Sequence, residues 1–390
     1  MSSLEENDMK LLFAPDSFKG SLTAIEITDI LDKVAARHFP GAETVSIPVA
    51  DGGEGTTDAL LRADFGKKYT LTVTGPLFEK EEAYWGMLGD GETAVMEMAQ
   101  ASGLPYVPEA ARDPRNATTF GTGEMILSAI RTGAKKILIG IGGSATNDGG
   151  MGMLAALGAK FTDEAGQVVS PVGGSLIKVA HADFSGLVPE LKNIEITVIC
   201  DVTNPLLGES GATWIYGPQK GATPAIRDEL EEGMKHYAQV VSAAVGRDIA
   251  GFPGAGAAGG LGAALGGVLR AQLKSGIDAV LEAVRFDQKL EGVDLVITGE
   301  GRIDGQSVRF GKVPVGVAKR CAAHGIPVCA IVGGIGDGAE GLYEICESTI
   351  QTTVSGPMPL QAAMENAAAL YESAADRLFR AVRIGMKLAR

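Results

Sequence analysis

The chain has 390 residues, of which 45% are hydrophobic and 21% charged, so it can bury a core and is not intrinsically disordered. This length predicts two domains of roughly 150 residues each. The net charge of −14, with no block of Lys or Arg, excludes an extended nucleic-acid-binding surface. A few cations in a cleft would still suffice to bind an anionic small molecule.

The composition also bears on location. The four cysteines form no C-x-x-C pair, which favours reduced thiols in a cytoplasmic protein. Residues 1–10 are acidic and polar and do not resemble a signal peptide. Residues 251–269 carry no charge, but they are mostly Gly and Ala with one Pro, which makes a poor membrane span. We therefore expect a cytoplasmic protein that does not enter a membrane.

Two strand–loop–helix units open the chain. Residues 11–14 form a short apolar strand, and Thr23 with Glu26 fits a capping box ahead of apolar residues at helical spacing. Residues 44–50 form a second strand, followed by a glycine turn and a helix from about residue 55. Two such units in succession predict parallel βαβ structure.

The pattern changes at about residue 65. Residues 67–99 alternate between strand character and glycine turns, which predicts an antiparallel meander. The elements predicted next are a helix over 119–131, a strand over 136–141, a strand ending at Asp201 and a helix over 222–245.

The parallel pattern resumes near residue 294. Three further elements are predicted: a strand that ends in "TGEG", a helix over 312–325 with a proline in its first turn, and a strand within 326–334. A long helix over 361–389 closes the chain. Because the two ends resemble each other, we predict an α/β protein. Its parallel Rossmann-like domain comprises 1–64 and 286–390, and a second mixed α/β domain, 65–285, is inserted into it.

Polar loops follow five of the apolar strands. They are 14–21, 49–56, 142–150, 297–307 and, without glycine, 200–206. Ligands of open α/β sheets bind beyond the carboxyl ends of the strands, so polar loops there are candidate walls of a site. One such loop alone is equally well explained as an ordinary α/β turn. The five together indicate a site.

The loops have a composition that suits phosphate. The string D-G-G-x-G occurs at 51–55 and at 148–152, each time between a strand and a helix, where bare backbone N–H groups cradle phosphate. The carboxylates there need a bridging Mg²⁺, a substrate hydroxyl or a structural role in the turn. The cations in glycine-containing turns are Lys19, Lys220, Arg302 and Lys312. Each could be an ordinary surface cation, but together they indicate phosphoryl transfer, which depends on positioning and charge neutralisation around Mg²⁺.

Other familiar chemistry is missing. The G-x-G-x-x-G at 254–259 lacks the buried strand that a dinucleotide fingerprint needs before it. The Walker-like string at 305–313 has one residue too many, and Val313 stands where Ser or Thr must bind Mg²⁺. The four histidines show no metal spacing, and no G-x-S-x-G elbow is present.

Eight strings of the chain, taken in order, closely resemble the bacterial glycerate kinase family, type 1. They are "APDSFKGSLTA", "PVADGGEGT", "GIGGSATNDGGMGML", "CDVTNPL", "GPQKGA", "GAAGGLGAAL", "DLVITGEGRIDGQS" and "GKVPVGVA". The resemblance runs from about residue 10 to residue 385. It implies ATP-dependent phosphorylation of D-glycerate with Mg²⁺, and two α/β domains with the active site in the cleft between them. It favours 2-phosphoglycerate as the product, with 3-phosphoglycerate, or another small hydroxy acid as substrate, left open.

The resemblance and the chemistry of the loops suggest roles on the substrate side. Lys19, with Asp16 and Ser17, is predicted to hold phosphate or the glycerate carboxylate. Asp51 is predicted to orient the attacking hydroxyl, which cannot ionise unaided, with Asp201 as the second choice. Alanine at Asp51 should then lower kcat by orders of magnitude without unfolding the protein. The other predicted substrate contacts are Gly52, Gly53 and Glu54.

The remaining predicted roles concern ATP and the metal. The residues predicted to bind the ATP phosphates are Gly142, Gly143, Ser144, Thr146, Asn147 and Lys220. Asp201 or Glu300 is predicted to hold Mg²⁺. Arg302 is predicted to neutralise the charge that develops on the transferred phosphoryl group.

Two rival functions share some of these features. A nicotinamide-dependent hydroxy-acid oxidoreductase would need a true dinucleotide fingerprint and usually a catalytic histidine in a loop. A non-catalytic protein that binds a sugar acid would not need so many carboxylates beside phosphate-type loops. We therefore expect D-glycerate and ATP as the partners, without nucleic acid or membrane, and the sequence leaves the oligomeric state open.

Overall fold

The computed structural model describes residues 9–50 and 52–388, which form two compact units. One comprises Gly52–Thr57 and Phe65–Gly276, and we call it the central unit. The other contains the rest of the described residues, and we call it the terminal unit. The domain bounds predicted from the sequence, and the cleft between the domains, stay predictions.

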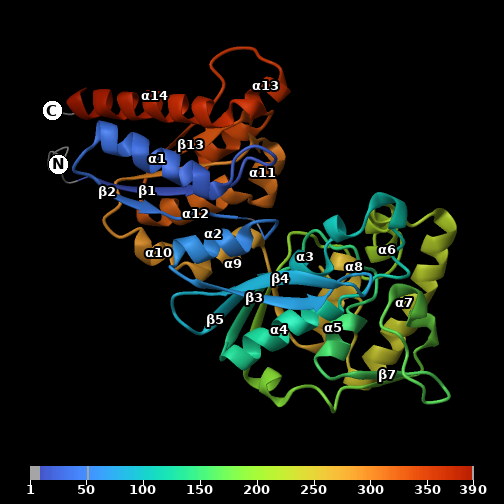
Figure 1. Ribbon diagram of the computed structural model, residues 1–390. Helices are drawn as coiled ribbons and strands as arrows, with labels where there is room; N and C mark the ends of the chain where they lie inside the picture. Colours follow the sequence, from blue (N-terminus) through green and yellow to red (C-terminus); the bar gives the residue numbers. More distant parts are fainter. Residues whose placement is uncertain (1–8, 51, 389–390) are drawn as a thin grey trace. The chain divides into compact units, whose positions relative to one another are not determined.

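A five-stranded parallel sheet forms the terminal unit (Figure 1). Its strands, from one edge to the other, are β15 (Ser348–Thr352), β13 (Val328–Val332), β11 (Leu295–Gly299), β1 (Lys10–Pro15) and β2 (Glu43–Ser46). Numbered along the chain they read 5-4-3-1-2, the flavodoxin-like order, in which the strand order reverses between β1 and β11. The parallel α/β class predicted from the sequence is confirmed.

Helices cover this sheet. Those that lie wholly or mainly in the terminal unit are α1 (Ala24–His38), α2 (Thr56–Ala63), α9 (Gly276–Ala283), α10 (Phe286–Lys289), α11 (Gly305–Phe310), α12 (Val313–His324), α13 (Leu360–Glu365) and α14 (Ala367–Leu388). The predicted capping box is confirmed, because Thr23 Oγ1 accepts the N–H of Glu26 and the Glu26 carboxylate accepts the N–H of Thr23. A two-stranded parallel ladder joins β12 (Arg302–Ile303) to β14 (Gly334–Ile335).

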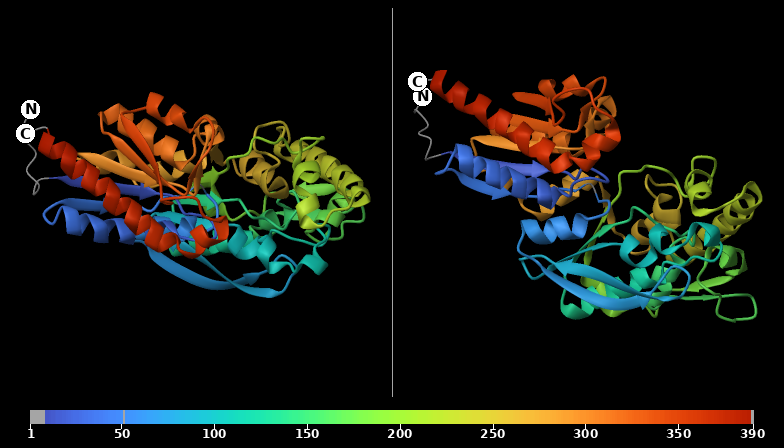
Figure 2. Two further views of the ribbon diagram at one scale, coloured as in Figure 1. Left: turned by 90° about the horizontal axis from the view of Figure 1, so that it is seen from above. Right: turned by 45° about the horizontal axis from the view of Figure 1, so that its top comes forward.

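The two faces of the sheet carry different helices. α1 and α14 lie side by side over one face (Figures 1 and 2), where Phe13 packs among Ile27, Leu31 and Phe379. Successive side chains of a strand point to opposite faces, so Leu12 faces away from this core. α12 packs against β1, β11 and β13 and covers the opposite face. The sheet is therefore buried on both sides, as parallel sheets usually are.

The closing helix predicted over 361–389 is two helices, α13 and α14. Asn366 separates them, and its side-chain Nδ2 donates to the carbonyl of Ala362 at 2.8 Å. A short amide side chain that bonds the backbone offers an alternative to continued helix, which accounts for the break. Residue 389 lies outside the described residues.

A six-stranded mixed sheet forms the core of the central unit. Its strands, in order across the sheet, are β10 (Gln272–Lys274), β9 (Glu195–Ile199), β6 (Lys136–Gly140), β5 (Thr93–Glu97), β4 (Lys80–Met87) and β3 (Lys67–Thr74). β3, β4 and β5 pair antiparallel, so the predicted meander is confirmed. The pairs from β5 to β10 are parallel. A short antiparallel pair joins β7 (Lys160–Thr162) to β8 (His181–Asp183).

The helices of the central unit pack on this sheet and on each other. They are α3 (Ala99–Ser102), α4 (Phe120–Thr132), α5 (Met151–Ala156), α6 (Ala212–Tyr216), α7 (Pro224–Val245) and α8 (Ala257–Gly262), followed by a π-helix over Ala263–Val268. Short 3₁₀ helices span Leu104–Tyr106, Glu109–Ala111, Gly173–Lys178, Pro189–Asn193, Pro218–Lys220 and Ala339–Glu344, the last of them in the terminal unit. The helices predicted over 119–131 and 222–245 correspond to α4 and α7.

The glycine–alanine segment is a packing element of the central unit. Inside α8, Ala258, Gly259 and Gly260 are left-handed, so the chain turns sharply there. A Cβ atom on Gly259 would lie 2.0 Å from the carbonyl oxygen of Thr146, so only glycine allows this approach. No helix among the described residues is both long and apolar enough to span a membrane.

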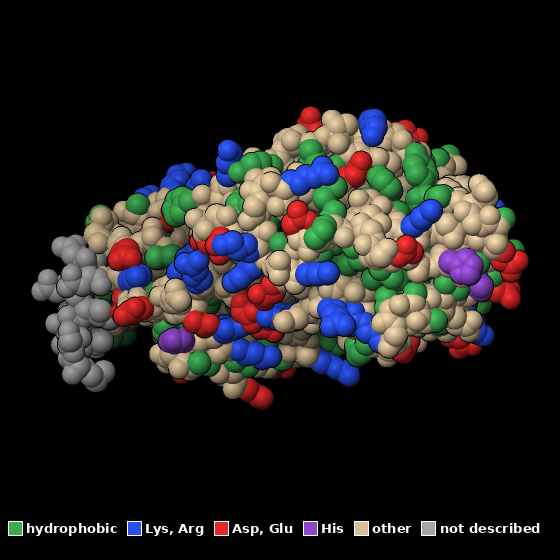
Figure 3. All heavy atoms as spheres, turned by 90° about the horizontal axis from the view of Figure 1, so that it is seen from below, with side chains coloured by type: hydrophobic (Ala, Val, Ile, Leu, Met, Phe, Trp, Pro, Cys, Tyr) green, Lys and Arg blue, Asp and Glu red, His purple; other side chains and the backbone are tan. Residues whose placement is uncertain are grey.

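Charges of both signs mix on the surface. On the face drawn in Figure 3, Lys and Arg side chains lie among Asp and Glu side chains, with apolar side chains scattered between them. On that face of the described chain, no field of one sign gathers.

Candidate active site

A cavity of about 380 Å³ opens at the carboxyl ends of the strands of the terminal unit. The loops that follow β1 and β11 supply Asp16–Lys19 and Glu300–Arg302, and Gly333 and Thr353 follow β13 and β15. β1 and β11 are the two strands between which the strand order reverses. Sheets of this class bind their ligands at that point, so the cavity lies where the fold favours a site.

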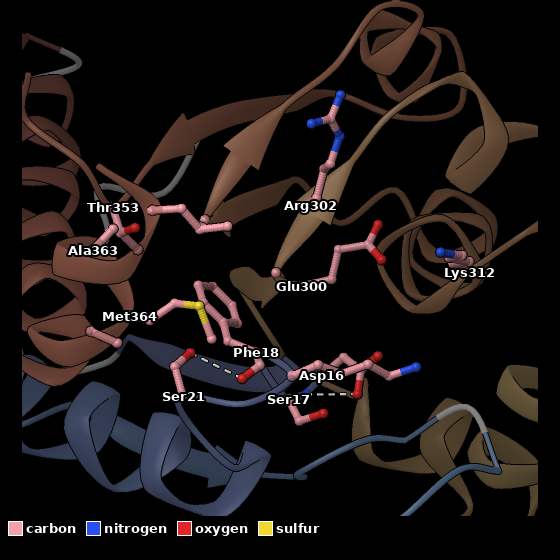
Figure 4. A pocket seen from close by; sticks show the side chains of 15 residues that line it. Asp16, Ser17, Phe18, Ser21, Glu300, Arg302, Lys312, Thr353, Ala363 and Met364 are labelled. Atoms are coloured by element: carbon pink, nitrogen blue, oxygen red, sulfur yellow. Dashed lines mark hydrogen bonds between the residues drawn. The ribbon is translucent and has the colours of Figure 1, made fainter. Parts of the chain in front are cut away.

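The cavity has a charged end and an apolar end (Figure 4). Glu300, Arg302 and Lys312 lie on one side of it, whereas Ala363 and Met364 lie on the other, across from Phe18. The full set of lining residues is Asp16, Ser17, Phe18, Lys19, Ser21, Glu300, Gly301, Arg302, Lys312, Gly333, Thr353, Leu360, Ala363, Met364 and Ala367. A ligand that is anionic at one end and apolar at the other would match this lining.

The loop after β1 is held closed by its own hydrogen bonds. The N–H of Asp16 donates to the carbonyl of Gly299 at 2.8 Å, and the Asp16 carboxylate accepts the N–H of Ser17 at 2.6 Å. The N–H of Phe18 donates to the carbonyl of Leu22 at 2.8 Å. These bonds fix the backbone that carries Lys19, whose side chain is exposed at the cavity.

The loop after β11 combines a buried carboxylate with an exposed cation. Glu300 is 5% exposed, whereas the side chain of Arg302 is 70% exposed, and its Nε lies 3.6 Å from Asp304 Oδ2. Asp304 caps α11 by accepting the N–H groups of Gln306 and Ser307, and the bond from Ser307 contributes most to lowering the pKa of Asp304. The guanidinium of Arg302 therefore remains accessible to an anion.

The second group of predicted residues lies in the loop between β6 and α5 of the central unit. Gly142 and Gly143 form an exposed tip, and Ser144 at its border is almost fully buried. Thr146 and Asn147 are fully buried, and Asn147 Nδ2 lies 3.2 Å from Thr213 Oγ1. The tip can offer its backbone to a phosphate, whereas the side chains of Thr146 and Asn147 are buried.

Lys220 lies buried beneath this tip. Its Nζ donates to Ser144 Oγ at 2.8 Å and to the carbonyl of Thr146 at 2.6 Å. Burial lowers the pKa of Lys220 to about 7, against the opposing attraction of Asp148. The sequence analysis predicted that Lys220 binds the ATP phosphates, because it stands in a glycine turn, and this role stays a prediction. In the structure Lys220 binds the loop itself.

Asp148 organises the start of two helices. Its carboxylate accepts the N–H and the hydroxyl of Thr119, both at 2.8 Å, and the N–H groups of Gly150 and Gly152, both at 3.1 Å. Burial raises the pKa of Asp148, and these four donors act in the opposite direction. Of the three roles open to carboxylates in such loops, Asp148 has the structural one.

The loop that carries the predicted substrate residues is hydrogen-bonded to a glutamate that was not predicted from the sequence. Glu97, at the end of β5, accepts the N–H of Gly55 at 3.2 Å and the N–H of Thr57 at 2.8 Å. The signal in the sequence that could have identified Glu97 is a carboxylate at the end of an apolar strand. Gly52 packs on Ile199, and the intermediate Gly53 and the exposed Glu54 follow it. Asp51 lies outside the described residues.

The two predicted metal ligands belong to different units. Asp201 is in the central unit, where its Oδ1 accepts the N–H of Gly276 at 2.7 Å and thereby fixes the start of α9. Glu300 is in the terminal unit. Within residues 9–50 and 52–388, no three His, Cys, Asp or Glu residues gather as a metal site would require. The Mg²⁺ ligands stay a prediction.

Comparison with known proteins identifies the family. The model of the glycerate kinase family matches residues 11–383, nearly the whole chain. The chain belongs to the glycerate kinase family. It is 47% identical to a glycerate kinase of Bacillus subtilis (strain 168) over 96% of this chain and 98% of the relative. It is 52% identical to the glycerate 2-kinase of Escherichia coli (strain K12) over 84% of this chain and 86% of the relative.

A solved structure agrees with this family. The crystal structure of a Salmonella typhimurium LT2 protein assigned as glycerate kinase 2 matches with a TM-score of 0.89 at 41% identity, covering 98% of this chain and all of that chain. The predicted membership of the glycerate kinase family is confirmed. The predicted phosphorylation of glycerate is supported at the level of the family, and neither rival function is needed.

Proposed function

We propose that this glycerate kinase transfers the γ-phosphoryl group of ATP to the C2 hydroxyl of D-glycerate, giving 2-phosphoglycerate, with Mg²⁺. The name of the Escherichia coli relative supports the choice of hydroxyl. The observation that carries the proposal is the cavity at the β1/β11 switch point, which is lined by three cations and two carboxylates. A cytoplasmic location, where ATP is available, is part of this proposal.

The cations of the cavity neutralise the charge of the transferred group. Lys19, Arg302 and Lys312 all line it, and all three are exposed to an incoming ligand. Phosphoryl transfer is catalysed mainly by positioning and by fixed positive charge, because the transferred group carries negative charge on its peripheral oxygens. Lys19, with Asp16 and Ser17 beside it, holds phosphate or the glycerate carboxylate.

The donor set of the cavity suits Mg²⁺. Asp16 and Glu300 both line it, and carboxylate oxygens are the protein ligands that Mg²⁺ prefers. We therefore place the metal with Glu300, with Asp16 as a new candidate beside the earlier candidate Asp201. When bound, the ion supplies charge neutralisation between phosphate oxygens.

The acceptor hydroxyl needs a carboxylate to orient it and to take its proton. Asp51 remains our choice, and Asp201 is the second. Glu97 holds the loop that follows Asp51 through two backbone N–H groups, so it acts as a positioning residue for that loop.

Enolase provides the sharpest test, because it acts on 2-phosphoglycerate and not on the 3-isomer. The chain is incubated with ATP, Mg²⁺ and D-glycerate, and phosphoenolpyruvate is measured with enolase as the only coupling enzyme. We expect immediate turnover with D-glycerate and little with L-glycerate. Turnover that appears only after a phosphoglycerate mutase is added would reject the C2 hydroxyl.

An arginine pair tests the role of the cavity in this reaction. Arg302→Ala should lower kcat at least about a hundredfold, because it removes charge stabilisation from the transition state. Arg309→Ala is the matched control, since Arg309 is exposed on α11 and does not line the cavity. Equal activity of the two variants would remove Arg302 from the mechanism.

A further inference from the structure

We infer that the cavity of the terminal unit is a nucleotide site whose apolar end holds the purine ring of ATP. The inference rests on the proposed function for the choice of ATP over other nucleotides. It assigns the nucleotide base to Phe18, Leu360, Ala363 and Met364, and the phosphates to the charged end. The sequence analysis had predicted that the ATP phosphates bind at the glycine loop and Lys220 of the central unit, and it had proposed no site for the base.

The size of the cavity is the first argument. Cavities of roughly 300–1,000 Å³ hold ligands the size of a drug or cofactor. At about 380 Å³, this cavity is far larger than a three-carbon acid requires. Glycerate is polar at every carbon, so it would leave the apolar end uncovered. A nucleotide fills both ends.

The apolar end is built to hold a flat ring. Phe18 is almost fully buried, and its ring meets that of Tyr371 edge to face with the centroids 5.6 Å apart. Ser21 donates its hydroxyl to the carbonyl of Phe18 at 3.0 Å, which closes the turn that carries this ring. Met364 faces this end with a thioether that adapts to flat aromatic surfaces (Figure 4).

Leu360 provides a second, independent observation. It lines the cavity at the start of α13, yet it is 75% exposed. A ring seated against Met364 and Leu360 would remove apolar surface from water, and each Å² so buried contributes about 25 cal/mol. The exposed leucine is thus explained as part of a wall that a ligand completes.

The charged end completes the match to a nucleotide. Arg302 and Lys312 stand at the opposite end from Met364, so a phosphate chain leaving the ring would run toward them (Figure 4). Lys19 adds a third cation to the lining of the cavity. The cavity lies at the β1/β11 switch point, where sheets with a flavodoxin-like strand order bind their ligands. Both ends of one ligand therefore find complementary side chains.

Calorimetry on the full chain tests the assignment, with ADP and inorganic tripolyphosphate as probes. Ala363→Phe fills the apolar end and leaves the cations in place. It should weaken ADP binding at least about tenfold, and it should leave tripolyphosphate binding and the KM for D-glycerate within about twofold. Gln361→Phe is the matched control, because Gln361 is exposed on the same helix and does not line the cavity. It should change none of these values.

A second variant covers the case in which Ala363→Phe fails to fold. Leu360→Ser changes an exposed side chain, so folding is preserved, and it should weaken ADP about threefold without affecting tripolyphosphate. Unchanged ADP affinity in both variants, or a rise confined to the KM for D-glycerate, overturns the assignment.

The wild-type chain separates this inference from the proposed function. If the wild type phosphorylates D-glycerate but neither substitution changes the affinity for ADP, the proposed function stands and the base binds elsewhere. If ADP binding responds as expected but D-glycerate is not phosphorylated, the nucleotide site stands and the proposed substrate is wrong.

Discussion

Lys220 illustrates how one buried charge supports a loop. It is 2% exposed, and it holds Ser144 Oγ and the carbonyl of Thr146 beneath the exposed tip at Gly142 and Gly143. Burying an ammonium group costs free energy unless its protons are bonded, and the bonds to Ser144 and Thr146 both go to the loop that the tip belongs to. The position of the tip therefore depends on a lysine that no ligand needs to touch.

Lys220 should make the stability of the enzyme rise with pH. Its pKa of about 7 in the folded chain lies below its ordinary value of 10.5, so between these pH values the unfolded chain binds more protons. The free energy of unfolding of the wild type should therefore increase relative to Lys220→Met as the pH rises from 7 toward 10.5. Urea unfolding of both proteins across this range measures the difference. Parallel pH profiles would show that Lys220 keeps an ordinary pKa.

At the scale of elements, the glycine-rich stretch 140–152 serves two purposes. Its tip is exposed, but its later glycines allow close packing inside the central unit. A Cβ atom on Gly150 would lie 2.4 Å from that of Ala264, at a φ of +73°. The sequence indicated a phosphate loop throughout, because glycine spacing alone does not separate an open backbone from a crowded one.

A comparison of alanine substitutions at two glycines distinguishes the cost of crowding from the cost of backbone strain. Gly150 and Gly166 both have a left-handed backbone, but a Cβ on Gly166 would meet nothing within 4 Å. Gly166→Ala should cost about 1 kcal/mol of unfolding free energy, from the strain of a positive φ alone. Gly150→Ala should cost about 3 kcal/mol, because overpacking adds to the same strain. Urea unfolding measures both values, and equal costs would refute the packing role.

The contact between α1 and α14 includes a hydrogen bond between two titratable side chains. His38 Nε2 lies 2.7 Å from Asp376 Oδ1, and Arg380 Nε lies 2.7 Å from Asp376 Oδ2. The hydrogen bond from Arg380, and then that from His38, lowers the pKa of Asp376 to about 2. His38 is buried, so its bond is sheltered from solvent, whereas Arg380 is exposed.

Acid should loosen this contact. A carboxyl whose folded pKa lies below its ordinary 3.8 stabilises the fold above that value and loses the effect as the pH falls toward about 2. Asp376→Asn should lower the free energy of unfolding at neutral pH by about 1 kcal/mol. It should also reduce the loss of unfolding free energy that the wild type shows as the pH falls toward about 2. Acid titrations followed by circular dichroism compare the two proteins, and superimposable curves would contradict this assignment.

At the scale of the whole molecule, local patterns predicted most elements but not their arrangement. The capping box at Thr23, the meander and the β6 strand followed from short-range spacing. The strand order did not, since β1 pairs with β11, whose residues lie 284 positions further along the chain. Glu97 was missed for the same reason, because its partners Gly55 and Thr57 lie about forty residues earlier.

The sequence predicted which residues belong to the site, but it did not predict how they come together in one cavity. The loops after strands were found, and Asp16, Ser17, Lys19, Glu300 and Arg302 do meet at one cavity. The apolar end of that cavity was not found, because Met364 comes from a helix whose break at Asn366 depends on a side-chain bond. The apolar side of the cavity is formed by tertiary packing, which local sequence patterns do not predict.

The central claim is that the chain phosphorylates D-glycerate at the C2 hydroxyl. The most direct measurement is the proton-coupled ³¹P spectrum of the product made from ATP, Mg²⁺ and D-glycerate. We predict a doublet, because the phosphorus of 2-phosphoglycerate couples to a single carbon-bound proton. A triplet, from coupling to a methylene group, would identify 3-phosphoglycerate, and the absence of any new phosphoester signal from the folded enzyme would contradict the kinase assignment itself.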